Sequence, residues 1–380
     1  MIQRVYAIAF GCLMILGMPL RPSAQANMRA LEPDQAGPDF PLQGEYLGES
    51  GDGKSVLAAQ VAALGDGAFK VAILPGGFPG AGYAGTGRVN ASGSRTSGKL
   101  QITGTGWQGS GDGTELKGTG PGGVTFALRR VERKSPTLGL QAPEGAKVLF
   151  DGKDISAWGA TAAIDSRGFL GVPSETKAKY GSFSVHLEFR LAFEPAGRGQ
   201  ARSNSGFCMT TSSWSELQIL DSFGDEPLAD GCGALYNVAK PLVTANYPPL
   251  AWQTYDIRYV APTIKAGDTV GQGTLTAWLN GVLVQDKTPL KNRPAASTIL
   301  LQDHTHPVFY RNIWMVDGKA DFDFLGAVSL RPRNSRGAPA AAPRAAAILL
   351  PGYHVGYLSG GDVRGADGRA AKSPSLDRGR

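Results

Sequence analysis

A regular alternation of apolar and polar side chains predicts the clearest element of the chain, a β-strand over residues 183–191. One face would carry Phe183, Val185, Leu187, Phe189 and Leu191, and the other Ser184, His186, Glu188 and Arg190. A period of two over such a stretch is typical of a strand and not of a helix. Similar patterns predict further strands at 205–209, 216–220, 253–260, 274–279, 299–302 and 310–316. Asn280-Gly281, directly after the strand at 274–279, is a type I′ hairpin signature. Because no helical run separates the strands, we expect two packed antiparallel sheets over residues 147–318.

The N-terminal part of the chain has a second set of short strand patterns, broken by glycine. Residues 56–64 and 68–74 flank Gly65-Asp66-Gly67, which predicts a hairpin. Later strands are predicted at 99–103, 115–118 and 124–131. We therefore expect a small Gly-rich β module over residues 40–132. A linker should follow at 133–146, where two X-Pro pairs favour extended backbone.

The composition agrees with an all-β protein, and the context of two glycine motifs argues against a dinucleotide-binding site. The 380 residues include 53 Gly and 25 Pro and are only 18% charged, which favours strands joined by tight turns. Two stretches fit the pattern G-x-G-x-x-G, one starting at Gly104 and one at Gly118. Neither opens a helix within a βαβ unit, so we interpret both as turns and not as dinucleotide sites.

Residues 1–26 have the three parts of a secretory signal peptide. Arg4 supplies the positive start, an apolar run covers residues 5–20, and Ala24-Gln25-Ala26 is a cleavage pattern. The apolar run is short for a membrane-spanning helix, and an uncleaved anchor is the alternative. We predict a mature chain that begins near Asn27, has no stable membrane span after cleavage, and is periplasmic or secreted.

Signal cleavage would also remove one of the three cysteines, Cys12, and leave Cys208 and Cys232. Disulfides can form in the compartment that we expect, so a bridge between these two residues is one alternative. Two buried free thiols are the plainer alternative. The spacing does not match a metal-binding cysteine cluster.

The net charge of +6 does not indicate a nucleic-acid partner. Residues 331–380 contain nine Lys/Arg and three Asp/Glu, which accounts for the whole excess. The charges in the rest of the chain cancel, so the folded part has no basic surplus for a nucleic-acid groove. This Ala-, Pro-, Arg- and Gly-rich segment is expected to be a disordered basic tail.

Polar residues occur on three predicted strands where a plain sandwich needs only solvent-compatible side chains. Glu216 and Gln218 share one face of their strand, and Gln302 and His304 share one face of theirs. Arg311 lies on the strand that follows. One interpretation is a solvated outer face. Because an acid, amides, an imidazole and a guanidinium group occur together, we favour a functional concave face.

The sandwich region also contains a series of ordered sequence blocks. They are Phe150-Asp151-Gly152-Lys153-Asp154 with Trp158, Asn204-Ser205-Gly206, Glu216-Leu217-Gln218-Ile219-Leu220-Asp221, Gly233-Ala234-Leu235-Tyr236, Trp252-Gln253-Thr254-Tyr255-Asp256-Ile257, Asn280-Gly281, and Gln302-Asp303-His304 through Arg311-Asn312-Ile313-Trp314. In this order they resemble the 3-keto-disaccharide hydrolase family, formerly a domain of unknown function. The Gly-rich module resembles a segment that often precedes this domain. The resemblance implies a concanavalin-like jelly-roll sandwich that acts on oxidised disaccharides or glycosides.

The implied chemistry assigns roles to the polar set. A ketone at sugar C3 makes the C2 proton acidic, so the site needs a base, an electrophile for the enolate and an acid for the leaving group. His304 fits the base, Arg311 the electrophile and Glu216 the acid. Asn204, Gln218 and Gln302 would hold sugar hydroxyls, and Tyr236 or Trp252 would stack on a sugar ring.

Three alternatives remain at this stage. A divalent metal is a possible cofactor that would replace the arginine as electrophile, with donors among His186, Glu188, Glu216 and His304. A conventional two-carboxylate glycosidase would pair Glu216 with Asp221 or Asp303. A non-catalytic carbohydrate-binding sandwich is the third alternative, because jelly rolls serve both purposes.

Overall fold

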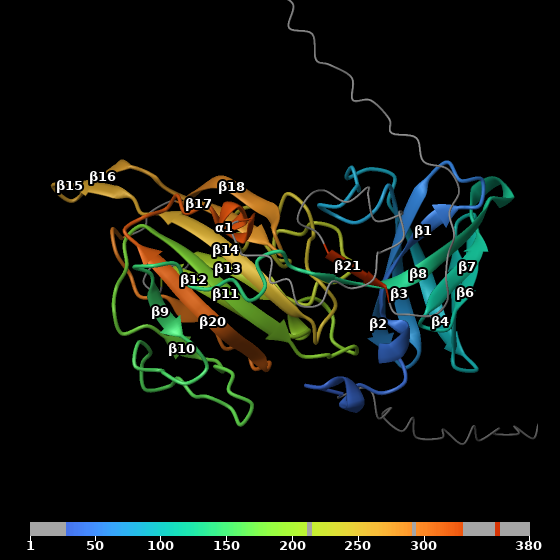
Figure 1. Ribbon diagram of the computed structural model, residues 1–380, viewed down its shortest axis with the longest axis horizontal. Coiled ribbons are helices and arrows are strands. Elements are labelled where there is room, and N and C mark those ends of the chain that lie inside the picture. The colour runs from blue at the N-terminus through green and yellow to red at the C-terminus, as the bar shows by residue number, and fades with distance from the viewer. Residues whose placement is uncertain (1–27, 211–214, 291–293, 330–353, 358–380) are drawn as a thin grey trace, which may run out of the picture.

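The structure is a computed structural model that describes residues 28–210, 215–290, 294–329 and 354–357 (Figure 1). It contains two β units, a barrel in the N-terminal part and a sandwich after it. The predicted signal peptide and most of the predicted tail lie outside the described residues. Among the residues described, no helix is long and apolar enough to cross a membrane.

The N-terminal unit is a closed antiparallel barrel. Its elements are η1 (Pro33–Gln35), η2 (Phe40–Leu42), β1 (Gly44–Ser50), β2 (Val56–Gly65), β3 (Ala68–Pro75), β4 (Val89–Thr96), β5 (Lys99–Gly104), β6 (Trp107–Gly111), β7 (Glu115–Thr119), η3 (Pro121–Gly123) and β8 (Thr125–Lys134). Each strand pairs with the next, and β1 also pairs with β8, which closes the barrel. The predicted hairpin is confirmed, with Gly65 opposite Ala68.

Glycine in the barrel strands leaves room for large side chains from the neighbouring strands to fill the interior. A Cβ atom at Gly93 would lie 2.8 Å from Leu100 Cδ1 and 2.9 Å from Phe69 Cβ. The large side chains therefore take the volume that the glycine leaves empty. This arrangement explains why β1, β4 and β6 escaped prediction, since their glycines and polar residues interrupt the apolar alternation.

The second unit is an antiparallel sandwich, and the predicted all-β jelly-roll fold is confirmed. Its elements are β9 (Lys147–Phe150), β10 (Ser174–Glu175), β11 (Phe183–Leu191), η4 (Gly199–Ala201), β12 (Asn204–Thr210), β13 (Ser215–Leu220), β14 (Trp252–Val260), β15 (Thr263–Lys265), β16 (Asp268–Gly271), β17 (Gly273–Leu279), β18 (Val282–Leu290), β19 (Leu300–Leu301), β20 (Val308–Asp317) and α1 (Phe324–Ser329). The strands form a six-stranded sheet, β18-β17-β14-β11-β20-β9, and a four-stranded sheet, β10-β19-β12-β13. The hairpin predicted at Asn280-Gly281 is present between β17 and β18, with positive φ at both residues.

The two sheets enclose one apolar core. Its members include the five apolar residues of β11 together with Phe207, Leu217, Ile219 and Leu301 from the opposite sheet. The alternation predicted for β11 is confirmed, because His186 and Glu188 face away from this core. All nine residues of the strand are nevertheless buried, since other segments cover its outer face.

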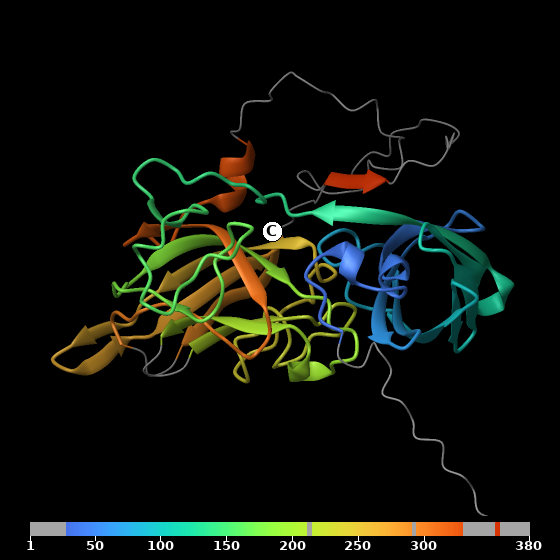
Figure 2. The ribbon, with the colours of Figure 1, turned by 90° about the horizontal axis from the view of Figure 1, so that it is seen from below.

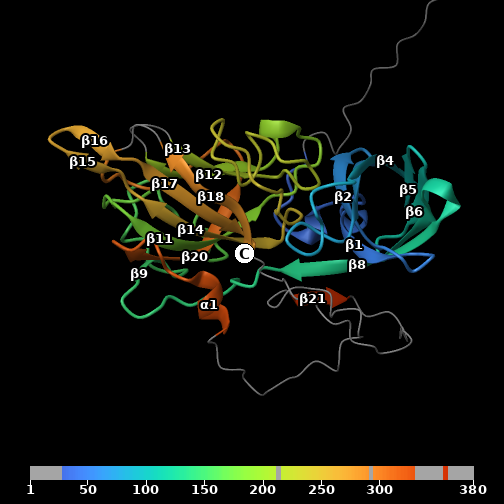
Figure 3. The same cartoon turned by 90° about the horizontal axis from the view of Figure 1, so that it is seen from above.

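Residues 135–146 form part of that cover. We expected an extended linker at 133–146, but β8 continues to Lys134 and the chain then packs on the six-stranded sheet. Thr137 Oγ1 donates to Asp256 Oδ2 at 2.6 Å, and the Gly139 amide donates to Glu188. Helix α1 lies on the same side of the sandwich (Figure 3). Phe324 of this helix packs with Leu140 in one apolar cluster.

Barrel and sandwich share buried contacts. Phe193 and Leu250 of the sandwich belong to the apolar cluster of the barrel. Arg133 on β8 makes a buried ion pair with Glu45, and its guanidinium lies 4.9 Å from the ring centroid of Tyr247 in the sandwich. The two units therefore pack as one body through an apolar and charged interface.

The shared interface leads to a prediction about fragments. A fragment of residues 147–318 exposes Phe193 and Leu250 and lacks the covering segment 135–146. We expect it to aggregate or to melt well below a fragment of residues 28–329, because buried apolar area would face water. Thermal unfolding of both fragments checks this expectation, and equal melting temperatures would contradict it.

Part of the predicted tail has a definite place. Strand β21 (His354–Tyr357) pairs antiparallel with residues 131–134 of β8. Figure 2 shows it beside β8, where β8 runs from the barrel towards the sandwich. Disorder is therefore not found at these four residues. Backbone pairing to an otherwise open stretch of β8 accounts for their order, although their composition gave no sign of it.

Candidate active site on the outer face of the four-stranded sheet

The outer face of the four-stranded sheet carries most of the polar residues singled out from the sequence. Asn204 lies on β12, Glu216 and Gln218 lie on β13, and Gln302 directly follows β19. Their inward-facing neighbours pack in the core, so the period of two sends these side chains outward. Asn204, Glu216 and Gln218 are at most 4% exposed, which is unusual for polar groups on an outer face.

Gly206 makes room for the carboxyl group of Glu216 at the centre of this face. A Cβ atom at Gly206 would lie 2.3 Å from Glu216 Oε1 and 2.6 Å from its Cγ. Gly206 pairs with Gln218 across the β12–β13 ladder, and the Gly206 carbonyl accepts a hydrogen bond from the backbone N–H of Gln302 at 2.9 Å. The carboxyl group of Glu216 thus lies over the backbone between the two glutamines.

Gln200 in η4 determines the orientation of the side-chain amides of Asn204 and Gln218. Its Nε2 donates to the backbone carbonyl of Asp230 at 2.8 Å, which leaves Oε1 as an acceptor. Oε1 accepts from Asn204 Nδ2 at 3.0 Å and from Gln218 Nε2 at 3.2 Å. Asn204 Nδ2 also donates to the backbone carbonyl of Gln200, so two hydrogen bonds fix the orientation of the Asn204 side-chain amide.

The oriented amides leave buried acceptor oxygens without donors. Asn204 Oδ1 and Gln218 Oε1 have no hydrogen-bond partner among the described residues, and neither does Gln302 Oε1. Buried polar atoms in folded proteins are almost always paired. A bound molecule rich in hydroxyl donors, with water in its absence, would complete these bonds.

His304 and Tyr236 lie at the edge of this face. His304 is exposed, in the turn after β19, and its ring is parallel to that of His306 at a centroid distance of 6.1 Å. His306 Nδ1 lies 2.5 Å from Glu194 Oε2, within hydrogen-bond distance, and no sequence pattern predicted this contact. Tyr236 is half-buried, and its amide donates to the Glu216 carbonyl at 2.9 Å.

The structure does not bring Arg311 and Trp252 to Glu216, contrary to our expectation of one shared face. Both lie on the outer face of the six-stranded sheet, where Arg311 pairs in register with Glu188. Its Nε donates to Glu188 Oε2 at 2.7 Å, and its guanidinium lies 4.0 Å from the Trp252 ring centroid. The strand patterns defined the faces within each sheet, but they did not say which sheet each strand joins.

The residues that the sequence suggested as metal ligands are also divided between the two sheets. His186 and Glu188 are buried under residues 135–146, whereas Glu216 lies on the other sheet. Burial acts to raise the pKa of Glu188, but contacts with His186, Asn312 and Arg311 outweigh it and lower the pKa to about 2. Among the described residues, no three His, Cys, Asp or Glu side chains are grouped as metal ligands.

The carboxylates of the glycosidase alternative are occupied elsewhere. Asp221 forms a buried ion pair with Arg202, whose Nε lies 2.9 Å from Asp221 Oδ2. Asp303 is exposed and accepts from the Thr305 amide at 2.8 Å, which stabilises its own turn. Asp221 also follows Glu216 by five residues, roughly 16 Å along an extended chain, which is beyond the separation of a catalytic carboxylate pair.

The two cysteines are free and buried, as the plainer alternative predicted. Burial raises the pKa of Cys232 to about 11. Burial also raises the pKa of Cys208, with a smaller contribution from the nearby Glu216. Cys208 therefore borders the Glu216 face as a neutral thiol and not as a nucleophile.

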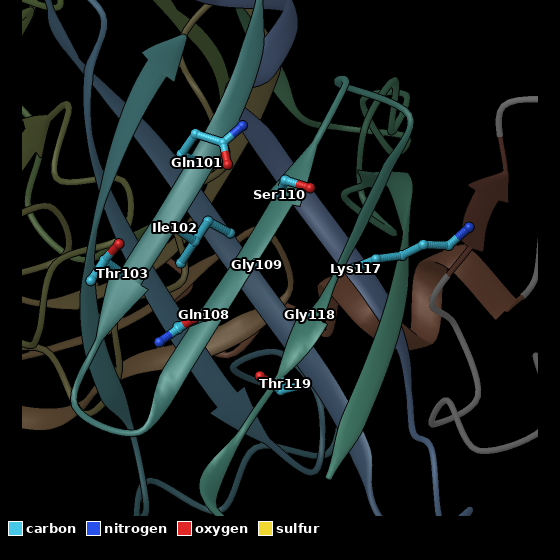
Figure 4. Close-up of a pocket in the computed structure, with 9 residues that line it drawn as sticks. All are labelled: Gln101, Ile102, Thr103, Gln108, Gly109, Ser110, Lys117, Gly118 and Thr119. Atoms are coloured by element: carbon cyan, nitrogen blue, oxygen red, sulfur yellow. The ribbon is translucent and has the colours of Figure 1, made fainter. Parts of the chain in front are cut away.

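The barrel carries a separate shallow hollow of about 560 Å³ (Figure 4). Its lining comes from β5, β6 and β7 and includes Gln101, Gln108, Ser110 and Lys117. These four side chains are exposed. The hollow has no buried acceptor that awaits a donor, so we place the candidate active site on the sandwich.

Two residues of this site escaped sequence analysis. Gln200 lies in a loop without periodicity, and Gly206 was noted only as part of a sequence block. The role of each depends on a partner from another segment, Asp230 for Gln200 and Glu216 for Gly206. No pattern within a single strand indicates such a partner.

Comparison with known protein families gives a match that falls on the sandwich. Residues 145–316 match the family described as the 3-keto-alpha-glucoside-1,2-lyase-like domain. A comparison with curated proteins gives no match. The family match supports a carbohydrate hydrolase or lyase that acts on glycosides.

Three solved structures from Parabacteroides distasonis ATCC 8503, described as candidate glycosyl hydrolases, are similar to the chain. One is 30% identical, with 52% of this chain and 99% of that chain covered and a TM-score of 0.44. A second is 19% identical, with 46% and 95% covered and a TM-score of 0.35. A third is 20% identical, with 46% and 100% covered and a TM-score of 0.34.

Proposed function

The chain belongs to the 3-keto-alpha-glucoside-1,2-lyase-like domain family, and on this premise we propose that it cleaves 3-keto-glycosides at the outer face of the four-stranded sheet. The observation that supports this site most directly is the set of buried acceptor oxygens around Glu216. Sugar hydroxyls are donors that match such oxygens. We place the activity outside the cytoplasm, in keeping with the signal pattern of residues 1–26.

The proposed reaction begins with loss of the C2 proton of the sugar. The C–H electron pair forms a C2=C3 enolate, with the negative charge on the former ketone oxygen. As the ketone re-forms, the C1–O bond breaks, and the departing oxygen takes a proton from an acid. Water then adds its hydroxyl to C1 and a proton to C2, which gives the free 3-keto sugar.

Glu216 and His304 are the groups to which we assign the proton transfers. Glu216 lies among acceptor oxygens, where a carboxyl proton can be donated to the departing glycosidic oxygen. His304, exposed at the edge, would accept the C2 proton. Asn204, Gln218 and Gln302 would bind hydroxyls, and Tyr236 would border the sugar ring.

The enolate also needs an electrophile, and Arg311 is committed to Glu188 on the other sheet. The amide oxygens of Asn204, Gln218 and Gln302 are of a type that hard divalent cations accept as ligands, and each has a second lone pair beside the one that a sugar hydroxyl would use, whereas Glu216 keeps its proton as the acid. We propose that a divalent cation, held by these oxygens, would stabilise the negative charge of the enolate. Chelation is therefore part of the test.

The substrate requirement can be measured with two sugars that differ only at C3. We expect 4-nitrophenyl 3-keto-α-glucoside to release 4-nitrophenol and the unoxidised glucoside to remain intact, because only the ketone acidifies C2. Deuterium at C2 should slow the reaction or exchange into water. EDTA should reduce the rate, and added divalent cation should restore it.

Variants and alternative outcomes complete this test. His304→Gln should abolish proton abstraction while the melting temperature is kept, because an amide is not a base of suitable strength. Cleavage of the unoxidised glucoside with full retention of the C2 label would instead support a two-carboxylate glycosidase. Binding of either sugar without turnover would support a carbohydrate-binding module.

A further inference from the structure

Gln200 connects two segments that border the Glu216 face. It lies between β11 and β12, and its side chain bonds to Asn204, Gln218 and the Asp230 carbonyl. Asp230 belongs to the long connection between β13 and β14. The side chain of Gln200 therefore joins that connection to the two strands that carry the acceptor oxygens.

The barrel holds the loop that contains Gln200. Arg198 Nη2 donates to the Leu64 carbonyl at 2.8 Å, and Arg202 Nη1 donates to the Ala63 carbonyl at 3.2 Å. Both carbonyls lie at the end of β2 in the barrel. Gln200 is thus held on both sides along the sequence by contacts with the other unit.

The barrel also holds the connection that contains Asp230. Lys70 on β3 pairs with Asp225, and Arg88 donates to the Gly224 carbonyl. Asn90 Nδ2 on β4 donates to Glu226 Oε1 at 3.2 Å. The segments at both ends of the Gln200–Asp230 hydrogen bond are therefore anchored to the same barrel.

We infer that Gln200 is a positioning residue of the candidate active site and that the barrel acts on the site through it. The inference rests on the proposed function. Without the Gln200 acceptor, the amides of Asn204 and Gln218 can rotate and present NH₂ groups where hydroxyl donors should bind. A donor facing a donor weakens binding, so Gln200 determines which substrate groups the site accepts.

Gln200→Ala should raise KM more than it lowers kcat, because the hydroxyl contacts form on substrate binding. Loss of two neutral hydrogen bonds predicts a fall in kcat/KM of about 10- to 100-fold, measured with 4-nitrophenyl 3-keto-α-glucoside. Gln101→Ala, on the barrel surface, is the matched control and should change neither constant. A purely structural role for Gln200 would lower the active fraction and kcat at constant KM, which would overturn the inference.

Gln200→Glu adds a readout that depends on pH. A protonated glutamic acid can donate to the Asp230 carbonyl and accept from both amides, whereas the carboxylate has no donor and its charge is repelled by the Asp230 carbonyl oxygen, which moves the acceptor away from the two amides. The ratio of its kcat/KM to that of the wild type should rise as pH falls. The same ratio for Gln200→Ala should stay flat, and parallel profiles for the two variants would contradict the inference.

Arg198→Ala tests the link to the barrel. It removes the contact with Leu64 and loosens the loop but keeps the Gln200 side chain itself. We therefore expect KM to rise, by less than in Gln200→Ala. An unchanged KM would show that the barrel does not act through this loop.

A separate measurement distinguishes this inference from the proposed function. If the wild type does not release 4-nitrophenol, the proposed function fails. NMR of the Asn204 and Gln218 side-chain amides still tests the positioning role, because both signals should shift in Gln200→Ala and stay fixed in Gln101→Ala. Unshifted amide signals in Gln200→Ala would overturn the positioning role alone.

Discussion

Gly206→Ala is expected to reduce turnover by at least about 100-fold while the protein stays folded. The added Cβ would lie 2.3 Å from Glu216 Oε1, so the carboxyl group has to leave its place over β12. A displacement of about 1 Å in a catalytic group costs roughly this factor. Turnover of the 3-keto-glycoside and the melting temperature, measured on the same preparation, check the result.

Gly171→Ala is the control for this substitution. The nearest atom to a Cβ at Gly171 is the Ala163 carbonyl oxygen at 3.7 Å, an ordinary contact. We expect wild-type turnover from this variant. Full activity in Gly206→Ala would mean that Glu216 does not act from its observed position.

Arg133→Met is expected to destabilise the protein by about 3–5 kcal/mol, because it leaves the buried Glu45 carboxylate without its cationic partner. Arg133 and Glu45 have side chains only 1% and 2% exposed, and two bonds of 2.7 and 2.6 Å join them. Arg133 also packs between Phe78 and Tyr247, so the loss falls on the interface of barrel and sandwich. The denaturant midpoint of the first unfolding transition measures the effect.

Lys117→Ala provides the comparison for this prediction. Lys117 pairs with Glu115 on the barrel surface, and its side chain is 67% exposed. Water screens such a pair, so we expect little or no change in the midpoint. Equal midpoints for Arg133→Met and the wild type would show that the interface does not depend on the buried pair.

Several features of the fold could be predicted from the sequence because they are local. The nine-residue alternation in β11 defines a strand and its two faces, and Asn280-Gly281 defines a hairpin with positive φ at both residues. The same reasoning placed Glu216 and Gln218 on one face. Ordered sequence blocks also indicated the family, which the match over residues 145–316 confirms.

Only the tertiary structure decided which of these faces form one site. Whether two strands lie in the same sheet depends on pairing between distant segments, and alternation within a strand carries no information about it. Arg311 and Trp252 therefore fell on the six-stranded sheet, away from Glu216. The roles of Gly206 and Gln200 likewise depend on partners from other segments. Local sequence determined which side chains face outward, whereas long-range packing determined which of them meet.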